Sequence, residues 1–168
     1  MEAYEAILTR RSIRAYTTQP VPDDAIKELL AAAMNAPSAS NQQPWQFVVV
    51  TAREQLDALA AVLPHGQMLK SAPLAIAVCG DRQLQGEEYW VQDCSAATQN
   101  LLLAAHAKGL GAVWLGVYPR SERVAGVSQL LNLPAHVIPL CVVSVGYPLE
   151  PQPPVRRYNE ARIHYDHW

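Results

Sequence analysis

The sequence VQDCSAATQNLLLAAHAK, residues 91–108, predicts the longest helix of the chain. Its alanine and leucine side chains spread around much of the helix circumference, and Gly109 suits the C-terminal cap. Glu87 and Glu88 stand just before it, where acidic side chains favour the helix dipole. A helix that is apolar over so wide an arc is buried on more than one side. We therefore place it at the centre of the domain or in a dimer interface.

Apolar and amphipathic segments on both sides of this helix predict strands that alternate with helices. The strands are expected at residues 46–51, 75–79, 112–117 and 137–147. Three further helices are expected at residues 2–10, 54–62 and 119–131. A fourth is expected to begin at Asp23 or Asp24 and to end just before Pro37. Asp23 or Asp24 is expected to cap its helix. The first two strands are nearly continuous apolar runs, so both of their faces should be covered by helices or a partner chain. The glycine patterns of dinucleotide folds and phosphate loops are missing.

Composition narrows the class of protein. The 168 residues carry a net charge of −2, which argues against general nucleic-acid binding, and no apolar stretch is long enough to span a bilayer. Residues 1–14 are polar, so no signal peptide is expected. Three scattered cysteines in apolar surroundings are typical of buried small hydrophobes in a reducing cytoplasm. His164 and His167 lack further ligands beside them, so no metal site is expected.

A cluster of basic residues near the N-terminus suggests an anion site. Arg10, Arg11, Ser12 and Arg14 place three guanidiniums and a hydroxyl within five residues. Arginine suits phosphate because its planar fork donates two parallel hydrogen bonds. In an extended loop Arg10, Ser12 and Arg14 would point the same way and converge on one anion. The alternative is a loop whose charges are simply solvated.

A second polar segment, PSASNQQPW at residues 37–45, connects a predicted helix to a strand. Asn41, Gln42 and Gln43 carry amides that both donate and accept hydrogen bonds. The pyrimidine edge of a flavin presents alternating donors and acceptors, so the amides of such a turn could form hydrogen bonds with it. The alternative is an ordinary polar connection.

The order of these motifs resembles the nitroreductase family of flavoproteins. The sequence RRSIR at 10–14 is followed about two dozen residues later by APSASNQQPW at 36–45. The segment GLGAVWLG at 109–116 is similar to the family's third flavin-contacting stretch, and Tyr147-Pro148 with a basic tail resembles its end. The resemblance covers essentially the whole chain and is strongest to the short members of the family.

The resemblance implies an α+β fold with a mixed, mainly antiparallel central sheet flanked by helices. Residues 1–168 would form a single FMN-binding domain, and the extended tail, 151–168, would reach onto the partner subunit. The protein would be a homodimer with FMN at the subunit interface and NAD(P)H as co-substrate.

The resemblance also implies a set of cofactor-binding residues. The arginine loop, residues 10–14, would hold the FMN phosphate and ring edge. Segment 37–43 would reach the same FMN from the other subunit, and the backbone of Gly116 would face the flavin N5. Either Arg156 or Arg157 would contact the phosphate, with Arg157 favoured. The full set is Arg10, Arg11, Ser12, Arg14, Pro37, Ser38, Asn41, Gln43, Gln67, Trp114, Leu115, Gly116, Arg156 and Arg157.

The implied activity is hydride transfer from NAD(P)H through flavin N5 to nitroaromatics, quinones or similar electron-poor acceptors, with ping-pong kinetics. No side-chain nucleophile or general base is required, because the cofactor carries the chemistry. Trp114 and Tyr118 are candidates for lining the substrate face or for core packing. Two alternatives stay open: a dehalogenating or flavin-fragmenting relative, and a flavin-binding or storage protein without turnover.

Overall fold

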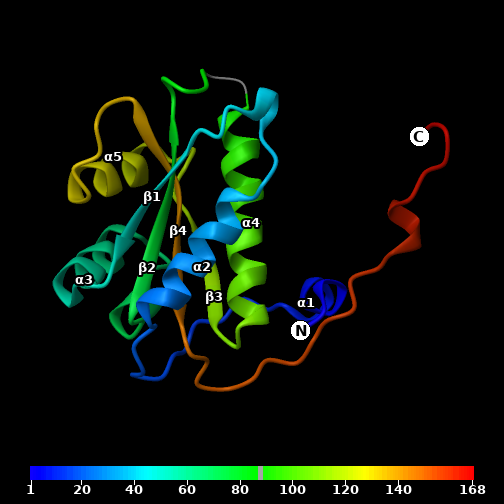
Figure 1. Cartoon of the computed structure of the whole chain (residues 1–168), viewed down its shortest axis with the longest axis horizontal. Coiled ribbons are helices and arrows are strands. Elements are labelled where there is room, and N and C mark those ends of the chain that lie inside the picture. The colour runs from blue at the N-terminus through cyan, green and yellow to red at the C-terminus, as the bar shows by residue number, and fades with distance from the viewer. Residues whose placement is uncertain (87–88) are drawn as a thin grey trace.

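The computed structural model describes residues 1–86 and 89–168, so the expected dipole interaction of Glu87 and Glu88 lies outside the described residues. Helices cover both faces of a central sheet, while the N-terminal helix and the C-terminal tail lie to one side of this body (Figure 1).

The predicted helices and strands are present, with bounds that differ by a few residues. The helices are α1 (Ala3–Thr9), α2 (Asp23–Met34), α3 (Arg53–Val62), α4 (Trp90–Ala107) and α5 (Ser121–Leu130). The strands are β1 (Trp45–Val50), β2 (Leu74–Asp81), β3 (Gly111–Gly116) and β4 (Val137–Gly146). Short 3-10 turns occur at Ala39–Asn41, Gln67–Lys70 and Glu160–Arg162.

The sheet has the strand order β1-β2-β4-β3, and each neighbouring pair is antiparallel. A parallel contact is added by an isolated bridge between Ser12 and Ala112, which fastens the arginine loop beside β3. The mainly antiparallel sheet predicted from the sequence is therefore confirmed.

Two apolar clusters cover the sheet, one on each face. The alternation of β2 sends Leu74, Ile76 and Val78 toward α2 and α4. The intervening residues Ala75 and Ala77 join the cluster under α3 and α5. Every residue of β2 before its last is buried, as its continuous apolar sequence predicted. β1 is an edge strand, and Val49, its next-to-last residue, stays 39% exposed.

The long helix α4 packs against α2 and against all four strands of the described sheet. Eight of its residues are buried, spread from its first residue, Trp90, to Ala105 in the last turn. Gly80 admits the Trp90 ring, because a Cβ on Gly80 would lie 2.3 Å from the indole. Gly109 ends the helix with a φ of +75°, a left-handed conformation that glycine adopts without strain. The predicted central position of α4 is confirmed.

Helix α2 departs from the prediction at its start. Pro22 occupies the N-cap position, and no side chain caps the helix. Asp23 and Asp24 instead lie in the first turn, where a carboxylate still interacts favourably with the helix dipole. The apolar residues of α2 recur at the spacing of a core-facing stripe. This stripe is buried at Ile26, but its last member, Met34, is 50% exposed.

Tyr16 fixes the arginine loop to the sheet. Its buried hydroxyl donates to the Ile13 carbonyl at 2.6 Å and shares a second 2.6 Å hydrogen bond with the Ser144 hydroxyl of β4. Burial raises the pKa of Tyr16 to about 12, so the phenol keeps its proton. The Ile13 N–H in turn donates to the Ala112 carbonyl at 3.0 Å. These bonds tie the loop to both β3 and β4.

We expect Tyr16→Phe to lower the free energy of unfolding by about 1–3 kcal/mol, because the Ile13 carbonyl and the Ser144 hydroxyl lose their partner. Urea unfolding followed by circular dichroism measures the change. Tyr4→Phe removes the same hydroxyl from a side chain that is 73% exposed and should leave stability unchanged. Equal stability of the two variants would contradict the anchoring role of Tyr16.

Candidate functional site

A hollow of about 390 Å³ brings together basic residues from the two ends of the chain. Arg10 and Arg11, at the end of α1, form one wall, and Arg156 and Arg157, in the C-terminal tail, form the other. The Arg11 guanidinium also donates to the Pro153 carbonyl, which joins the tail to the loop. Four of the residues predicted to bind one cofactor therefore line one cavity.

The electrostatics of this hollow favour an anion. The pKa of Arg10 is lowered by burial and then by the positive charges of Arg157 and Arg11. None of the described residues that line the hollow is acidic. Guanidiniums gathered without a carboxylate repel one another, and a bound phosphate would relieve that repulsion while accepting their hydrogen bonds.

Ser12 and Arg14 occupy a different position. Neither lines the hollow, so the arginines that share it are Arg10 and its neighbour Arg11 rather than alternate residues. Ser12 lies in the bridge to Ala112, and Arg14 is exposed. The loop thus joins the hollow lined by Arg10, Arg11, Arg156 and Arg157, the arginine hollow, to β3.

The outer edge of β3 presents main-chain groups that can bind a ligand. Ala112 uses its carbonyl to accept from the arginine loop, on the side away from β4. Because main-chain groups alternate along a strand, those of Trp114 and Gly116 point to the same side. Four residues of strand carry this edge about 13 Å beyond Ala112. Gly116 is exposed, and a Cβ added there would meet nothing within 4 Å. Leu115 between them is buried.

The segment from residue 37 to residue 43, the amide loop, is closed by its own hydrogen bonds. The Gln43 N–H donates to the Ser38 hydroxyl at 3.0 Å, and the Gln43 amide donates to Asn41 Oδ1 at 2.8 Å. Pro37 and Asn41 are exposed, so the loop displays its polar side chains. The Ala39 N–H donates at 3.0 Å to Oδ1 of Asp93, which lies in the first turn of α4. Sequence reasoning missed Asp93, whose signal was the one carboxylate in the long helix predicted at residues 91–108.

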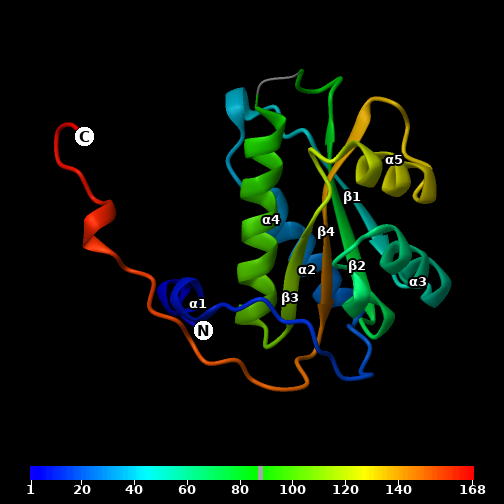
Figure 2. The same ribbon diagram turned by 180° about the vertical axis from the view of Figure 1, so that it is seen from behind.

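The amide loop and the arginine hollow lie at opposite ends of α4. At the far end, His106 Nε2 and the Thr9 hydroxyl form a 2.8 Å hydrogen bond that docks α1. Burial and the charge of Arg10 lower the pKa of His106. The thirteen residues from Asp93 to His106 correspond to about 20 Å of helix. Both views show α1 beside the lower end of α4 and the loop after α2 at its upper end (Figures 1 and 2). One protomer does not bring the two predicted segments together.

Gln67 lies away from the hollow. It begins a 3-10 turn before β2, and its amide donates to the Ala60 carbonyl of α3 at 3.4 Å. The structure therefore does not join Gln67 to the four arginines within one protomer.

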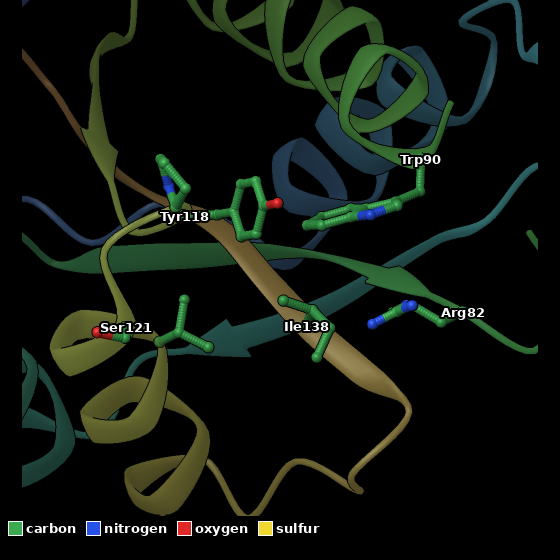
Figure 3. Close-up of a pocket in the computed structure, with 7 residues that line it drawn as sticks. Arg82, Trp90, Tyr118, Ser121 and Ile138 are labelled. Carbon is green, nitrogen blue, oxygen red and sulfur yellow. The ribbon is translucent and has the colours of Figure 1, made fainter. Parts of the chain in front are cut away.

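A second hollow, of about 430 Å³, lies at the other end of the sheet (Figure 3). Tyr118 and Trp90 meet edge to face in it with ring centroids 4.9 Å apart, and Ile138 and Arg82 face the same space. It shares no residue with the arginine hollow. Tyr118 is 42% exposed and so belongs to a surface rather than to the core.

Other chemistry is limited in the described part of the chain. Burial raises the pKa of the Cys79 and Cys141 thiols to about 12, which keeps them protonated and poorly nucleophilic. No group of three or more His, Cys, Asp or Glu side chains that could hold a metal occurs in residues 1–86 and 89–168. Among the described helices, none has the length and hydropathy needed to cross a bilayer.

Comparison with known proteins identifies relatives over the full length. The model of the nitroreductase family matches residues 7–70 and 61–147. A protein of Methanothermobacter thermautotrophicus, provisionally named NADH dehydrogenase/NAD(P)H nitroreductase, is 50% identical over 169 residues, which cover 100% of this chain and 88% of that protein. A crystal structure from Parabacteroides distasonis with the same provisional name has a TM-score of 0.96 at 46% identity and covers 99% of this chain and 98% of its own.

A further crystal structure, of a provisionally named nitroreductase from Desulfovibrio desulfuricans, was solved in complex with FMN. It has a TM-score of 0.85 at 34% identity and covers 100% of this chain and 98% of its own. These matches confirm the predicted family and fold. The chain belongs to the nitroreductase family.

Proposed function

We propose that this protein is an FMN-dependent NAD(P)H oxidoreductase that reduces nitroaromatics, quinones or similar electron-poor acceptors. Family membership supports the reaction class, and the FMN-bound relative supports the cofactor. The observation that carries the proposal is the hollow lined by four arginines, joined through Ser12 to the open edge of β3. When bound, FMN would accept a hydride from NAD(P)H at N5 and pass the reducing equivalents to the acceptor.

The phosphate would bind in the arginine hollow. Arg10 and Arg11 would supply guanidinium donors from the loop, with the Ser12 hydroxyl nearby. Arg157 is the better candidate from the tail, because its charge acts on Arg10. Arg156 lines the same hollow and would add to its positive potential. The donor set fits a phosphate because it is cationic and forked, and because no acidic residue is among the described residues that line the hollow.

The flavin ring would lie along the outer edge of β3. The N–H groups of Trp114 and Gly116 point to that side. The Gly116 carbonyl accepts there from Arg123 at 3.0 Å, and a Cβ added at Gly116 would meet nothing within 4 Å. We assign the Gly116 N–H as the donor to N5, with Leu115 holding the strand in the core. Arg14 is the candidate for contacting the polar edge of the ring. Gln67, just before β2, is the candidate for contacting the ribityl chain.

We further propose that the site is completed by a second copy of the chain. The segment from Pro37 to Gln43 lies about 20 Å from the arginine hollow along α4, so it would reach the flavin of the partner. Two surfaces support a dimer. The outer face of α1 exposes Tyr4, Ile7 and Leu8, and residues 151–168 of the tail are exposed throughout. Such apolar exposure is typical of an interface.

The three unpaired, buried thiols fit a reducing compartment, so we propose that the enzyme works in the cytoplasm.

The phosphate assignment predicts a difference between two flavins. Arg10→Ala should weaken FMN binding by about tenfold or more, because a charge-assisted hydrogen bond is lost, and should leave riboflavin binding unchanged. Quenching of flavin fluorescence on titration into apoprotein measures both dissociation constants. Arg120→Ala, an exposed arginine beside α5, serves as the control and should bind FMN as the parent does. Equal loss of FMN and riboflavin binding in Arg10→Ala would contradict the phosphate site.

The reaction class predicts that NADH or NADPH bleaches the bound flavin. Under anaerobic conditions the flavin absorbance near 450 nm should fall when the nucleotide is added and return when a quinone follows. Stopped-flow absorbance separates these two half-reactions. A yellow protein that neither nucleotide bleaches would overturn the reductase proposal and favour a storage protein.

A further inference from the structure

We propose that Asp93 is a positioning residue for the flavin site: its carboxylate fixes the loop from Pro37 to Gln43 through the Ala39 N–H. This inference rests on the proposed function, because it concerns the loop that would contact the flavin of a second copy. Asp93 would touch neither flavin nor substrate and would act through the main chain of the loop.

The surroundings of Asp93 argue against a role in stabilising the fold. The residue is 5% exposed, and Oδ1 accepts from the Ala39 N–H at 3.0 Å. Oδ2 is buried and has no hydrogen-bond partner within the described protomer. A buried carboxylate with one unsatisfied oxygen loses hydration energy that one hydrogen bond and its place in the first turn of α4 return only in part. We therefore infer that Asp93 contributes to the conformation of the loop rather than to the stability of the fold.

The loop has a backbone that needs such a tether. Ser40, Asn41 and Gln43 all have φ values between 51° and 55°, in the left-handed region that non-glycine residues adopt at a cost. The hydrogen bonds of Gln43 close the loop on itself but do not tie it to the body. The bond from Ala39 to Asp93 supplies a connection to α4.

A second polar residue on the same face of α4 extends the tether. Asn100 lies seven residues after Asp93, a spacing that places both on one side of the helix. Its amide donates at 3.1 Å to the Ala32 carbonyl, near the end of α2. Asn100 thus fixes the helix that leads into the loop, and Asp93 fixes the first turn of the loop itself.

Three variants test the inference through the FMN dissociation constant of the folded protein. Asp93→Asn keeps an oxygen for the Ala39 N–H and should bind FMN within about threefold of the parent. Asp93→Leu removes that acceptor and should weaken FMN by about tenfold or more. Ala39→Pro removes the donor instead. Proline is tolerated there because Ala39 begins a 3-10 turn and Ser38 before it is extended.

The double variant Asp93→Leu with Ala39→Pro should bind FMN no more weakly than the weaker single variant, because both changes break the same bond. The unfolding midpoint of the apoprotein is a second readout. It should stay level or rise in Asp93→Leu, since an unsatisfied buried charge is removed. Asp57→Leu, on the exposed side of α3, is the matched control and should leave FMN binding unchanged.

Additive losses in the double variant would overturn the inference, and so would parent-like FMN affinity of folded Asp93→Leu. If Asp93→Leu fails to fold, Ala39→Pro alone decides, and parent-like FMN binding by it contradicts the tether. These outcomes differ from a failure of the proposed function, in which the parent protein itself would bind no FMN.

Discussion

The burial of α4 is the constraint on which the rest of the structure depends. The helix packs against α2 and crosses all four strands of the described sheet, so its axis is fixed relative to the core. Each of its ends then carries one of the two segments of the candidate site. Asp93 holds the amide loop at the start, and His106 docks α1 near the finish. The rigid length between them keeps the two segments about 20 Å apart in one protomer.

The candidate site consists mostly of cations and main-chain groups. Arg10, Arg11 and Arg157 line a hollow that has no acidic residue among its described lining residues, and the edge of β3 offers an N–H group at Gly116. This arrangement suits a protein whose cofactor carries the reaction, because the polypeptide then only has to bind, orient and neutralise it. The buried thiols, with raised pKa values at Cys79 and Cys141, supply no competing nucleophile.

Periodicity and apolar runs were sufficient to predict the helices, the strands and the central place of α4, because burial patterns repeat locally in sequence. Contacts between distant segments were harder. That Arg157 shares a hollow with Arg10 followed only from the family resemblance, since no local pattern links the two ends of a chain. Asp93 was missed because its partner is a main-chain N–H 54 residues away. The prediction that Asp23 or Asp24 caps α2 was wrong, because Pro22 occupies the N-cap position.

Mixed dimers test the central claim, that each flavin site combines the arginine hollow of one chain with the amide loop of another. One chain would carry Arg10→Ala and the other Asn41→Ala with Gln43→Ala, each binding FMN weakly by itself. Refolding the two together and titrating with FMN should restore parent-like affinity at one site of every heterodimer, because one hollow and one loop remain intact across it. If each chain instead held a complete site, the mixture would show no high-affinity binding, and the account would be contradicted.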